Sequence, residues 1–296
     1  MAEDVPAVPL RDGNLIPQLG YGTWQIPNAD CPRIIGEAIT AGYRSFDTAQ
    51  GYRNEEGLGR AIRESGIAPS AFFVTSKLRN ATHTRDLALR SFDETMKRLG
   101  IDQIDLFLIH WPVPAQDKYV EAWKTLIELQ QQGHIRSIGV ANFERVHMER
   151  LIAETGVTPA VNQIELHPLF QQREWRGYHL RRNIRIASAS PLGPGTSASA
   201  WWWTHGRSTP GTALLDPSIT AIAKAHKKTP AQIIIRWHLQ EGLILQPRST
   251  RADRMAENIN VFDFTLTAED VYRIEALDRP DHGRIGVAPS EWNVMT

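Results

Sequence analysis

RSFDTAQGY, residues 44–52, predicts a short apolar strand that ends in a carboxylate and continues into a loop. Asp47 stands at the end of the strand, and a turn containing Gly51 then presents the phenol of Tyr52. The same form recurs in two further apolar stretches that end in a titratable residue: FFVTSK (72–77), ending in Lys77, and IDLFLIHWP (104–112), with His110. Successive strands that end in different titratable residues indicate one converging site.

Around these stretches, short and nearly continuous apolar runs alternate with helical patterns along the chain. The predicted strands are 19–24, 44–48, 72–77, 104–110, 135–141, 160–166, 184–190 and 243–247. The predicted helices lie near 30–42, 54–65, 82–99, 117–132, 144–155, 171–182, 216–228, 230–241, 251–258 and 267–277. Because strands that are apolar throughout are buried on both faces, the sheet should be parallel. Eight βα steps in one run favour an α/β fold of the TIM barrel type, a closed (β/α)₈ barrel, over an open doubly wound sheet.

Two segments are expected to lie outside the repeated βα units. Residues 7–18 predict an N-terminal capping hairpin, with turn chemistry supplied by Asp12 and Gly13. A long loop rich in Gly, Ser, Pro and Trp, residues 191–211, follows the seventh strand, on the face where barrels hold their active sites. No linker, fixed-period repeat or charge block divides the chain, so residues 1–296 are expected to form a single domain.

The composition of the chain narrows the class of protein. With 42% hydrophobic and 22% charged residues, the chain can bury a large core and is not disordered. Lys and Arg together number 33, as do Asp and Glu, so no net field favours nucleic acid or an anionic membrane. The single Cys31 excludes a disulfide framework and a multi-cysteine metal site, and we expect no metal. Because the N-terminus lacks a signal-peptide pattern and no apolar run approaches a bilayer span, we expect a soluble, cytoplasmic protein.

In a barrel the carboxyl ends of the strands meet around one mouth, which would bring Asp47, Lys77 and His110 together beneath Tyr52. A phenol with a pKa of about 10 is a poor acid at neutral pH, and a nearby ammonium is expected to lower that pKa. Lys77 can play this part, Asp47 can hold Lys77, and His110 can donate to a substrate oxygen. Such a set protonates a developing alkoxide, which arises when a carbonyl accepts hydride. No side chain supplies hydride, so a nicotinamide cofactor is implied.

Each of these residues also has a structural interpretation when taken alone. Asp47 could cap a helix or form a turn, Tyr52 could be a rim aromatic, and Lys77 could be a solvated surface amine. His110 could be a core histidine bonded to the backbone. Their occurrence together on successive strand ends is what favours catalysis. A Rossmann fold is not indicated, because no G-x-G-x-x-G follows a strand, and neither G-x-S-x-G nor a P-loop is present.

Over nearly its whole length the chain resembles the aldo-keto reductase superfamily. The motifs that carry the resemblance stand in family order and spacing: DGNLIPQLGYGTW, DTAQGYRNEEGLGRAI, TSKL, DLFLIHWP, RSIGVANF, PAVNQIELHP, SPLG and QPRSTRADRMAEN. TPAQIIIRWHLQEG and INVFDFTLT resemble the bacterial branch that contains 2,5-diketo-D-gluconate reductases. The resemblance makes Asp47, Tyr52, Lys77 and His110 the family tetrad, with Tyr52 as the acid.

The resemblance also implies NADPH (NADP+) as cofactor and assigns its contacts residue by residue. Asn142 and Gln163 match residues that hold the nicotinamide carboxamide. The other assigned positions are Thr23, the pyrophosphate loop with Ser190, Leu192 and Gly193, the 2′-phosphate clamp Arg248, Ser249, Thr250 and Arg254, and Glu257 and Asn258 at the adenine. Two guanidiniums and two hydroxyls before a helix N-terminus would form a strong phosphate site. The alternative for the clamp is a set of surface arginines on a solvated helix.

Departures from the family pattern concern the nicotinamide side of the site. Ala189 replaces the aromatic residue that usually stacks under the nicotinamide, and Ala141 replaces a serine. These losses should weaken nicotinamide binding unless a ring from Trp201–Trp203 in the long loop takes over. Local packing of that tryptophan run within its own loop is an equal alternative.

The substrate wall mixes retained and altered residues. Trp24 and Trp111 match the apolar walls of the family, whereas Arg79 stands where a Trp is usual, and Arg53 adds a second cation. The cations point to an acidic or polyoxygenated substrate such as a keto-sugar acid, and the tryptophan run points to a bulky aromatic one.

The sequence therefore predicts a monomeric NADPH-dependent carbonyl reductase that acts on a small-molecule aldehyde or ketone and can run in reverse as an alcohol dehydrogenase. Neither nucleic acid nor a membrane is expected as a partner. The alternative from another class is a cofactor-binding sensor or regulatory protein on the same barrel. A hydrolase or isomerase of another barrel family would need a metal cluster or a phosphate-only site.

Overall fold

The computed structural model describes residues 5–193 and 212–295, in which eight strands form one parallel sheet. The strands are β3 (Tyr21–Gly22), β4 (Ser45–Asp47), β5 (Phe73–Leu78), β6 (Ile104–Ile109), β7 (Ile135–Ala141), β8 (Val161–Glu165), β9 (Arg185–Ala189) and β10 (Ile244–Leu245). Each strand pairs in parallel with the next one along the chain, and a parallel bridge between Leu19 and Leu245 joins the first edge to the last. The predicted barrel is confirmed.

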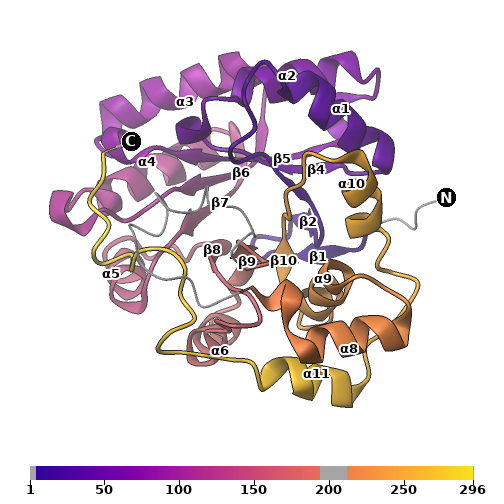
Figure 1. Ribbon diagram of the computed structural model, residues 1–296. Helices are drawn as coiled ribbons and strands as arrows, with labels where there is room; N and C mark the ends of the chain where they lie inside the picture. Colours follow the sequence, from indigo (N-terminus) through magenta and orange to yellow (C-terminus); the bar gives the residue numbers. More distant parts are fainter. Residues whose placement is uncertain (1–4, 194–211, 296) are drawn as a thin grey trace.

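Helices surround the strands on the outside of this barrel (Figure 1). They are α1 (Cys31–Ala41), α2 (Glu55–Glu64), α3 (Arg85–Leu99), α4 (Tyr119–Gln131), α5 (Arg145–Thr155), α6 (Arg173–Arg181), α8 (Pro217–His226), α9 (Pro230–Gln240), α10 (Ala252–Ile259) and α11 (Ala268–Glu275). Each overlaps a predicted helix, because residues that favour helix starts and stops stand at several of the ends. Gly42 closes α1 in the left-handed conformation at φ 111°, and Thr229 and Gln232 form a capping box at the start of α9.

Two strands are reduced to two residues each, much less than the apolar runs predicted. The run 19–24 yields only Tyr21–Gly22, and the run 243–247 yields only Ile244–Leu245. Pairing nevertheless continues where the barrel closes, since the amide of Gly20 donates to the carbonyl of Leu245 at 2.9 Å. The two strands are therefore shorter than predicted, but the barrel still closes.

The predicted N-terminal hairpin is present and covers one end of the barrel. β1 (Ala7–Pro9) and β2 (Leu15–Pro17) pair antiparallel. Leu10 and Ile16 are buried in the same apolar cluster as Leu106 and Leu108 of β6. Because Asn14 contacts the first residues of β7, the hairpin lies at the amino ends of the strands.

Alternation along β5 decides which side chains face the barrel interior. Phe73 belongs to the interior cluster, whereas Val74 and Leu78 pack in the cluster between strands and helices. Side chains two residues apart share a face of a strand, so Lys77 faces inward with Phe73 and Ser76 faces the helices. The carboxyl end of β5 thus presents a cation to the barrel mouth.

Of the predicted long loop 191–211, only residues 191–193 lie within the described part of the chain, and Trp201–Trp203 lie outside it. Within the described ranges, no helix is both long and apolar enough to cross a membrane. After α11 the chain runs past α6 and α5 (yellow in Figure 1), and it reaches the loops at the carboxyl ends of the strands.

Candidate active site

Asp47 and Lys77 form a buried ion pair at the carboxyl ends of β4 and β5. The Lys77 Nζ lies 2.6 Å from Asp47 Oδ1 and also donates to the carbonyl of Thr48 at 2.8 Å. Burial lowers the pKa of Lys77, but Asp47 and Tyr52 together outweigh burial, so that the pKa lies above its ordinary value. Lys77 is therefore a fixed, charged group beneath the mouth.

Tyr52 ends the 3₁₀ turn η1 (Gln50–Tyr52), and its hydroxyl oxygen lies 3.5 Å from Lys77 Nζ. Burial raises the pKa of Tyr52, while Lys77 acts in the lowering direction, and the net shift is upward. The expectation that Lys77 would bring this pKa below its ordinary value is wrong for the protein without ligand. The cost of desolvating a phenolate exceeds the attraction of one ammonium, and the phenol stays protonated.

His110 follows β6, and its ring meets the Tyr52 ring edge-on with centroids 5.6 Å apart. Burial lowers the pKa of His110 to about 3, and the nearby Lys77 and His83 add to that shift. The imidazole is consequently neutral at physiological pH. Its Nδ1 is buried and has no hydrogen-bond partner among the described residues.

The four residues predicted from strand ends are thus brought together, and two predicted nicotinamide contacts join them. Gln163 Nε2 donates to the second carboxylate oxygen of Asp47 at 2.9 Å, and Asn142 Nδ2 donates to the carbonyl of His110 at 2.9 Å. Asn142 holds a left-handed backbone at φ 61°. Both amides therefore lie at the mouth, in contact with the tetrad, and their role toward nicotinamide stays a prediction.

Thr23, which was assigned to the cofactor, and the two departures from the family pattern, Ala141 and Ala189, differ in exposure. The Thr23 hydroxyl is fully buried and donates to the carbonyl of Asp47 at 3.0 Å, so in this structure it steadies the strand end. Ala141 is buried inside the barrel, and Ala189 is partly exposed at the end of β9. The hypothesis that a ring from Trp201–Trp203 replaces the aromatic residue missing at Ala189 stays untested, because those tryptophans lie outside the described residues.

The residues assigned to the phosphate and adenine end line one cavity of about 410 Å³. Its walls are Leu192, Leu214, Leu215, Thr229, Pro230, Ala231, Arg248, Ser249, Thr250, Arg251, Arg254, Glu257 and Asn258. The start of α10 and the arginine side chains make a donor set that fits a phosphate ester. Arg251, which was not predicted, lines the same cavity but is already ion-paired with Asp253.

The loop that was expected beside the pyrophosphate is a tight turn. Ser190 and Gly193 have positive φ values of 52° and 75°, and the Gly193 amide donates to the Ser190 carbonyl at 2.8 Å. Leu192, between them, reaches the cavity at the start of α10. The turn after β9 therefore reaches the cavity that holds the predicted phosphate clamp.

The substrate side of the mouth holds the predicted tryptophans and one residue that was not predicted. Trp24 is partly buried, and Trp111 is buried and stacks on Trp292 with ring centroids 4.8 Å apart and planes at 24°. Arg53 and Arg79 are exposed, on the loops that follow Tyr52 and β5. Trp292 gave no signal in the sequence, because only the folded chain returns its C-terminal segment to β6.

Glu165 is a second residue that sequence reasoning missed. Its two carboxylate oxygens accept the amides of Ile285 and Gly286 at 2.6 and 2.8 Å. Burial raises the pKa of Glu165, but His167 and the two amides outweigh burial and bring the pKa below its ordinary value. A charged Glu165 thus ties the C-terminal segment to the mouth. A cavity of about 530 Å³, lined by Asn142 and Glu165 among others, lies beside these hydrogen bonds between Glu165 and the C-terminal segment.

The chain belongs to the aldo/keto reductase family, whose model matches residues 18–279. An aldo-keto reductase of Mycolicibacterium smegmatis is 46% identical over 97% of this chain and 98% of its own length. The methylglyoxal reductase DkgA of Escherichia coli O157:H7 is 44% identical over 96% of this chain and 97% of its own. A solved structure of a Gox0644 mutant in complex with NADPH has a TM-score of 0.89 and 44% identity, and covers 98% of this chain and 99% of that one. The predicted family and enzyme class, an NADP-dependent oxidoreductase, are confirmed.

Proposed function

We propose that this chain is a monomeric NADPH-dependent carbonyl reductase in which Tyr52 is the general acid. The observation that carries the proposal is the Tyr52 hydroxyl, which lies 3.5 Å from the ammonium of Lys77 in its buried ion pair with Asp47. When bound, NADPH supplies the hydride that reduces the carbonyl carbon. Tyr52 donates its proton to the carbonyl oxygen, and Lys77 stabilises the phenolate that remains. His110, which is neutral and faces Tyr52, orients the same oxygen.

The residues around the two ends of the site support NADPH as the cofactor of this chain. Arg248 and Arg254, with Ser249 and Thr250, would hold the 2′-phosphate at the start of α10. Asn142 and Gln163, which already contact the tetrad, would orient the nicotinamide. NADPH in the structure of the Gox0644 mutant is consistent with this assignment.

For the substrate, we propose a small, oxygen-rich aldehyde or ketone. Arg53 and Arg79 place two cations beside a mouth whose apolar walls are Trp24 and Trp111. Relatives in Escherichia coli are named methylglyoxal reductase, and the sequence resembles the branch of 2,5-diketo-D-gluconate reductases. A dicarbonyl or a keto-sugar acid fits these cations better than a bulky hydrocarbon does.

Replacement of Tyr52 by Phe tests the role of the acid. We expect Tyr52→Phe to lower kcat for methylglyoxal reduction by about 100-fold or more, since the proton donor is lost. NADPH binding, followed by tryptophan fluorescence, should stay within about twofold of the parent because the clamp lies elsewhere. Tyr272→Phe, at an exposed phenol on α11, is the matched control. A Tyr52→Phe enzyme with near-parental kcat would remove Tyr52 from this role.

The alternative, a cofactor-binding sensor, has the changed positions Ala141 and Ala189 in its favour. Both replacements remove groups that the family pattern places against nicotinamide. NADPH binding by tryptophan fluorescence, measured together with turnover, separates the two functions. A protein that binds NADPH tightly but turns over neither dicarbonyls nor keto-sugar acids would be the sensor.

A further inference from the structure

The side chain of Gln50, two residues before Tyr52, uses all of its hydrogen-bonding capacity inside the protein. Its Nε2 donates to the carbonyl of Ser91 and to the hydroxyl of Thr95, each at 2.9 Å. Its Oε1 accepts from the Ser91 hydroxyl at 2.8 Å and from the backbone amide of Arg79 at 3.0 Å. A side-chain amide offers two donors and two acceptor sites, so Gln50 is saturated.

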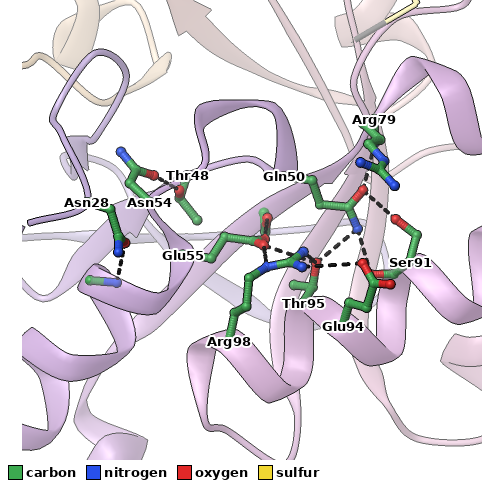
Figure 2. Close-up of polar contacts among 12 residues, drawn as sticks. Asn28, Thr48, Gln50, Asn54, Glu55, Arg79, Ser91, Glu94, Thr95 and Arg98 are labelled. Carbon is green, nitrogen blue, oxygen red and sulfur yellow. Dashed lines mark hydrogen bonds and ion pairs between the residues drawn. The ribbon is translucent and has the colours of Figure 1, made fainter.

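On the other side of Tyr52, the carboxylate of Glu55 is held in the same manner. Ser76 donates to Glu55 Oε1 at 2.6 Å, and Thr95 donates to Oε2 at 3.3 Å. Arg98 Nε neutralises the buried charge at 2.7 Å. The Thr95 hydroxyl accepts from Gln50 and donates to Glu55, which makes the two sets of bonds one network, as Figure 2 shows.

The residues of this network stand close in sequence to both partners of the Tyr52–Lys77 contact. Gln50 and Glu55 flank Tyr52 along the chain. Ser76 and Arg79, which they contact, flank Lys77 at the end of β5. Gln50 and Glu55 are in turn joined through α3, whose residues Ser91, Thr95 and Arg98 point toward them (Figure 2).

We propose that Gln50 and Glu55 are positioning residues, which together fix the distance between the Tyr52 hydroxyl and the Lys77 ammonium through α3. This inference rests on the proposed function of Tyr52. The turn that carries Tyr52 is only three residues long and passes directly into the left-handed Arg53 at φ 57°, so the local backbone alone fixes its place poorly. A displacement of about 1 Å at a reacting group can cost on the order of 100-fold in rate.

Gln50→Met tests the proposal, since methionine keeps the length of the side chain and loses every hydrogen bond. We expect kcat for methylglyoxal to fall about tenfold or more, with KM and the NADPH dissociation constant within about twofold. The basic limb of the kcat profile should also move to higher pH. Lys77, Asp47 and His110 are the charged and titratable groups around Tyr52, and a looser Lys77 lowers the pKa of Tyr52 less.

Gln18→Met is the matched control for lost stability. Gln18 is as buried as Gln50, 8% against 7% exposed, and donates to the carbonyls of Leu239 and Leu243 far from the mouth. Rates are normalised to NADPH-binding sites, so that unfolded protein does not count. Equal losses of kcat in both variants, or an unmoved basic limb in Gln50→Met, would overturn the positioning role.

Two further variants keep the outcomes separate. Ser91→Ala removes one bond to Gln50 Oε1 and should give a smaller loss of kcat than Gln50→Met; if Gln50→Met does not fold, a parental kcat in Ser91→Ala overturns the proposal by itself. Tyr52→Phe is measured beside them. High activity in Tyr52→Phe would refute the proposed function, whereas an inactive Tyr52→Phe with a fully active Gln50→Met would refute only the positioning role.

Discussion

The Lys77 ammonium and the Asp47 carboxylate lie 2.6 Å apart at the ends of two adjacent parallel strands, both almost wholly removed from solvent. A buried charge is tolerated only when its partner stays in place. Gln163 fixes the other oxygen of Asp47 at 2.9 Å, so the ion pair is held from both sides. The site is therefore built around a preformed cation that lies 3.5 Å from the Tyr52 hydroxyl.

Asp47→Asn should damage both activity and stability. The substitution keeps the shape of the side chain but leaves the Lys77 charge buried without its counterion. We expect the free energy of unfolding to drop by about 3 kcal/mol and kcat to fall at least about tenfold. Urea denaturation and steady-state kinetics on the same preparation give both values.

The control for Asp47→Asn is Asp263→Asn. Asp263 pairs with Lys228 at 2.7 Å, but its side chain is 52% exposed. Loss of such a pair costs less than about 1 kcal/mol. Comparable destabilisation in the two variants would contradict the special status of the buried pair.

Arg254→Ala should change cofactor preference. A charge-assisted bond to a phosphate is worth about 1.5–3 kcal/mol, so we expect the NADPH dissociation constant to rise about 10- to 100-fold. The constant for NADH, which lacks the 2′-phosphate, should rise less than about threefold. Arg251→Ala is the control, because Arg251 lines the same cavity but is already paired with Asp253. Equal effects of Arg254→Ala on both cofactors would show that Arg254 does not read the phosphate.

Much of the fold and the tetrad could be predicted because the signals are local. Each short apolar run is bounded by a helix with readable ends, and Asp47, Lys77 and His110 each stand at the end of such a run. Parallel barrel topology then carries strand ends to one mouth without further information. Tyr52 follows from its proximity to Asp47 in the chain.

The remaining features depend on partners far away in the sequence. Gln50 gives no local signal, because its partners Ser91 and Thr95 lie 41 and 45 residues further on. Trp292 acquires its role only when the C-terminal segment returns to Trp111. The predicted direction of the Tyr52 pKa shift is wrong because the shift is a balance between burial, which raises the pKa, and the Lys77 ammonium, which lowers it. The extent of burial is known only from the fold.

Trp292→Ala should weaken substrate binding and leave the cofactor unaffected. A stacked aromatic pair is worth about 0.5–1.5 kcal/mol beyond its buried area, so loss of the ring against Trp111 should raise KM for methylglyoxal about tenfold. Trp292→Phe keeps a stacking ring and should recover most of the affinity. Val294→Ala, at a side chain 42% exposed in the same segment, is the control. An unchanged KM in Trp292→Ala would exclude the C-terminal segment from the substrate wall.

His83→Leu should protect the protein against acid. His83 is buried, neither ring nitrogen has a hydrogen-bond partner among the described residues, and burial lowers its pKa to about 4. In the unfolded chain His83 has an ordinary pKa of about 6.5, so between about pH 4 and about pH 6.5 it binds a proton there but stays neutral in the folded chain. The free energy of unfolding that depends on neutral His83 is intact above about pH 6.5 and is lost as the pH falls toward about 4, by about 2 kcal/mol at about pH 5.

His83→Leu should remove this acid-dependent loss of about 2 kcal/mol, as measured by urea denaturation at about pH 7 and about pH 5. The substitution should not destabilise the protein at the higher pH, because no hydrogen bond is broken. His282→Leu, at an exposed imidazole, is the control, and a pH dependence identical to the parent in His83→Leu would show that His83 takes up its proton in the folded state as well.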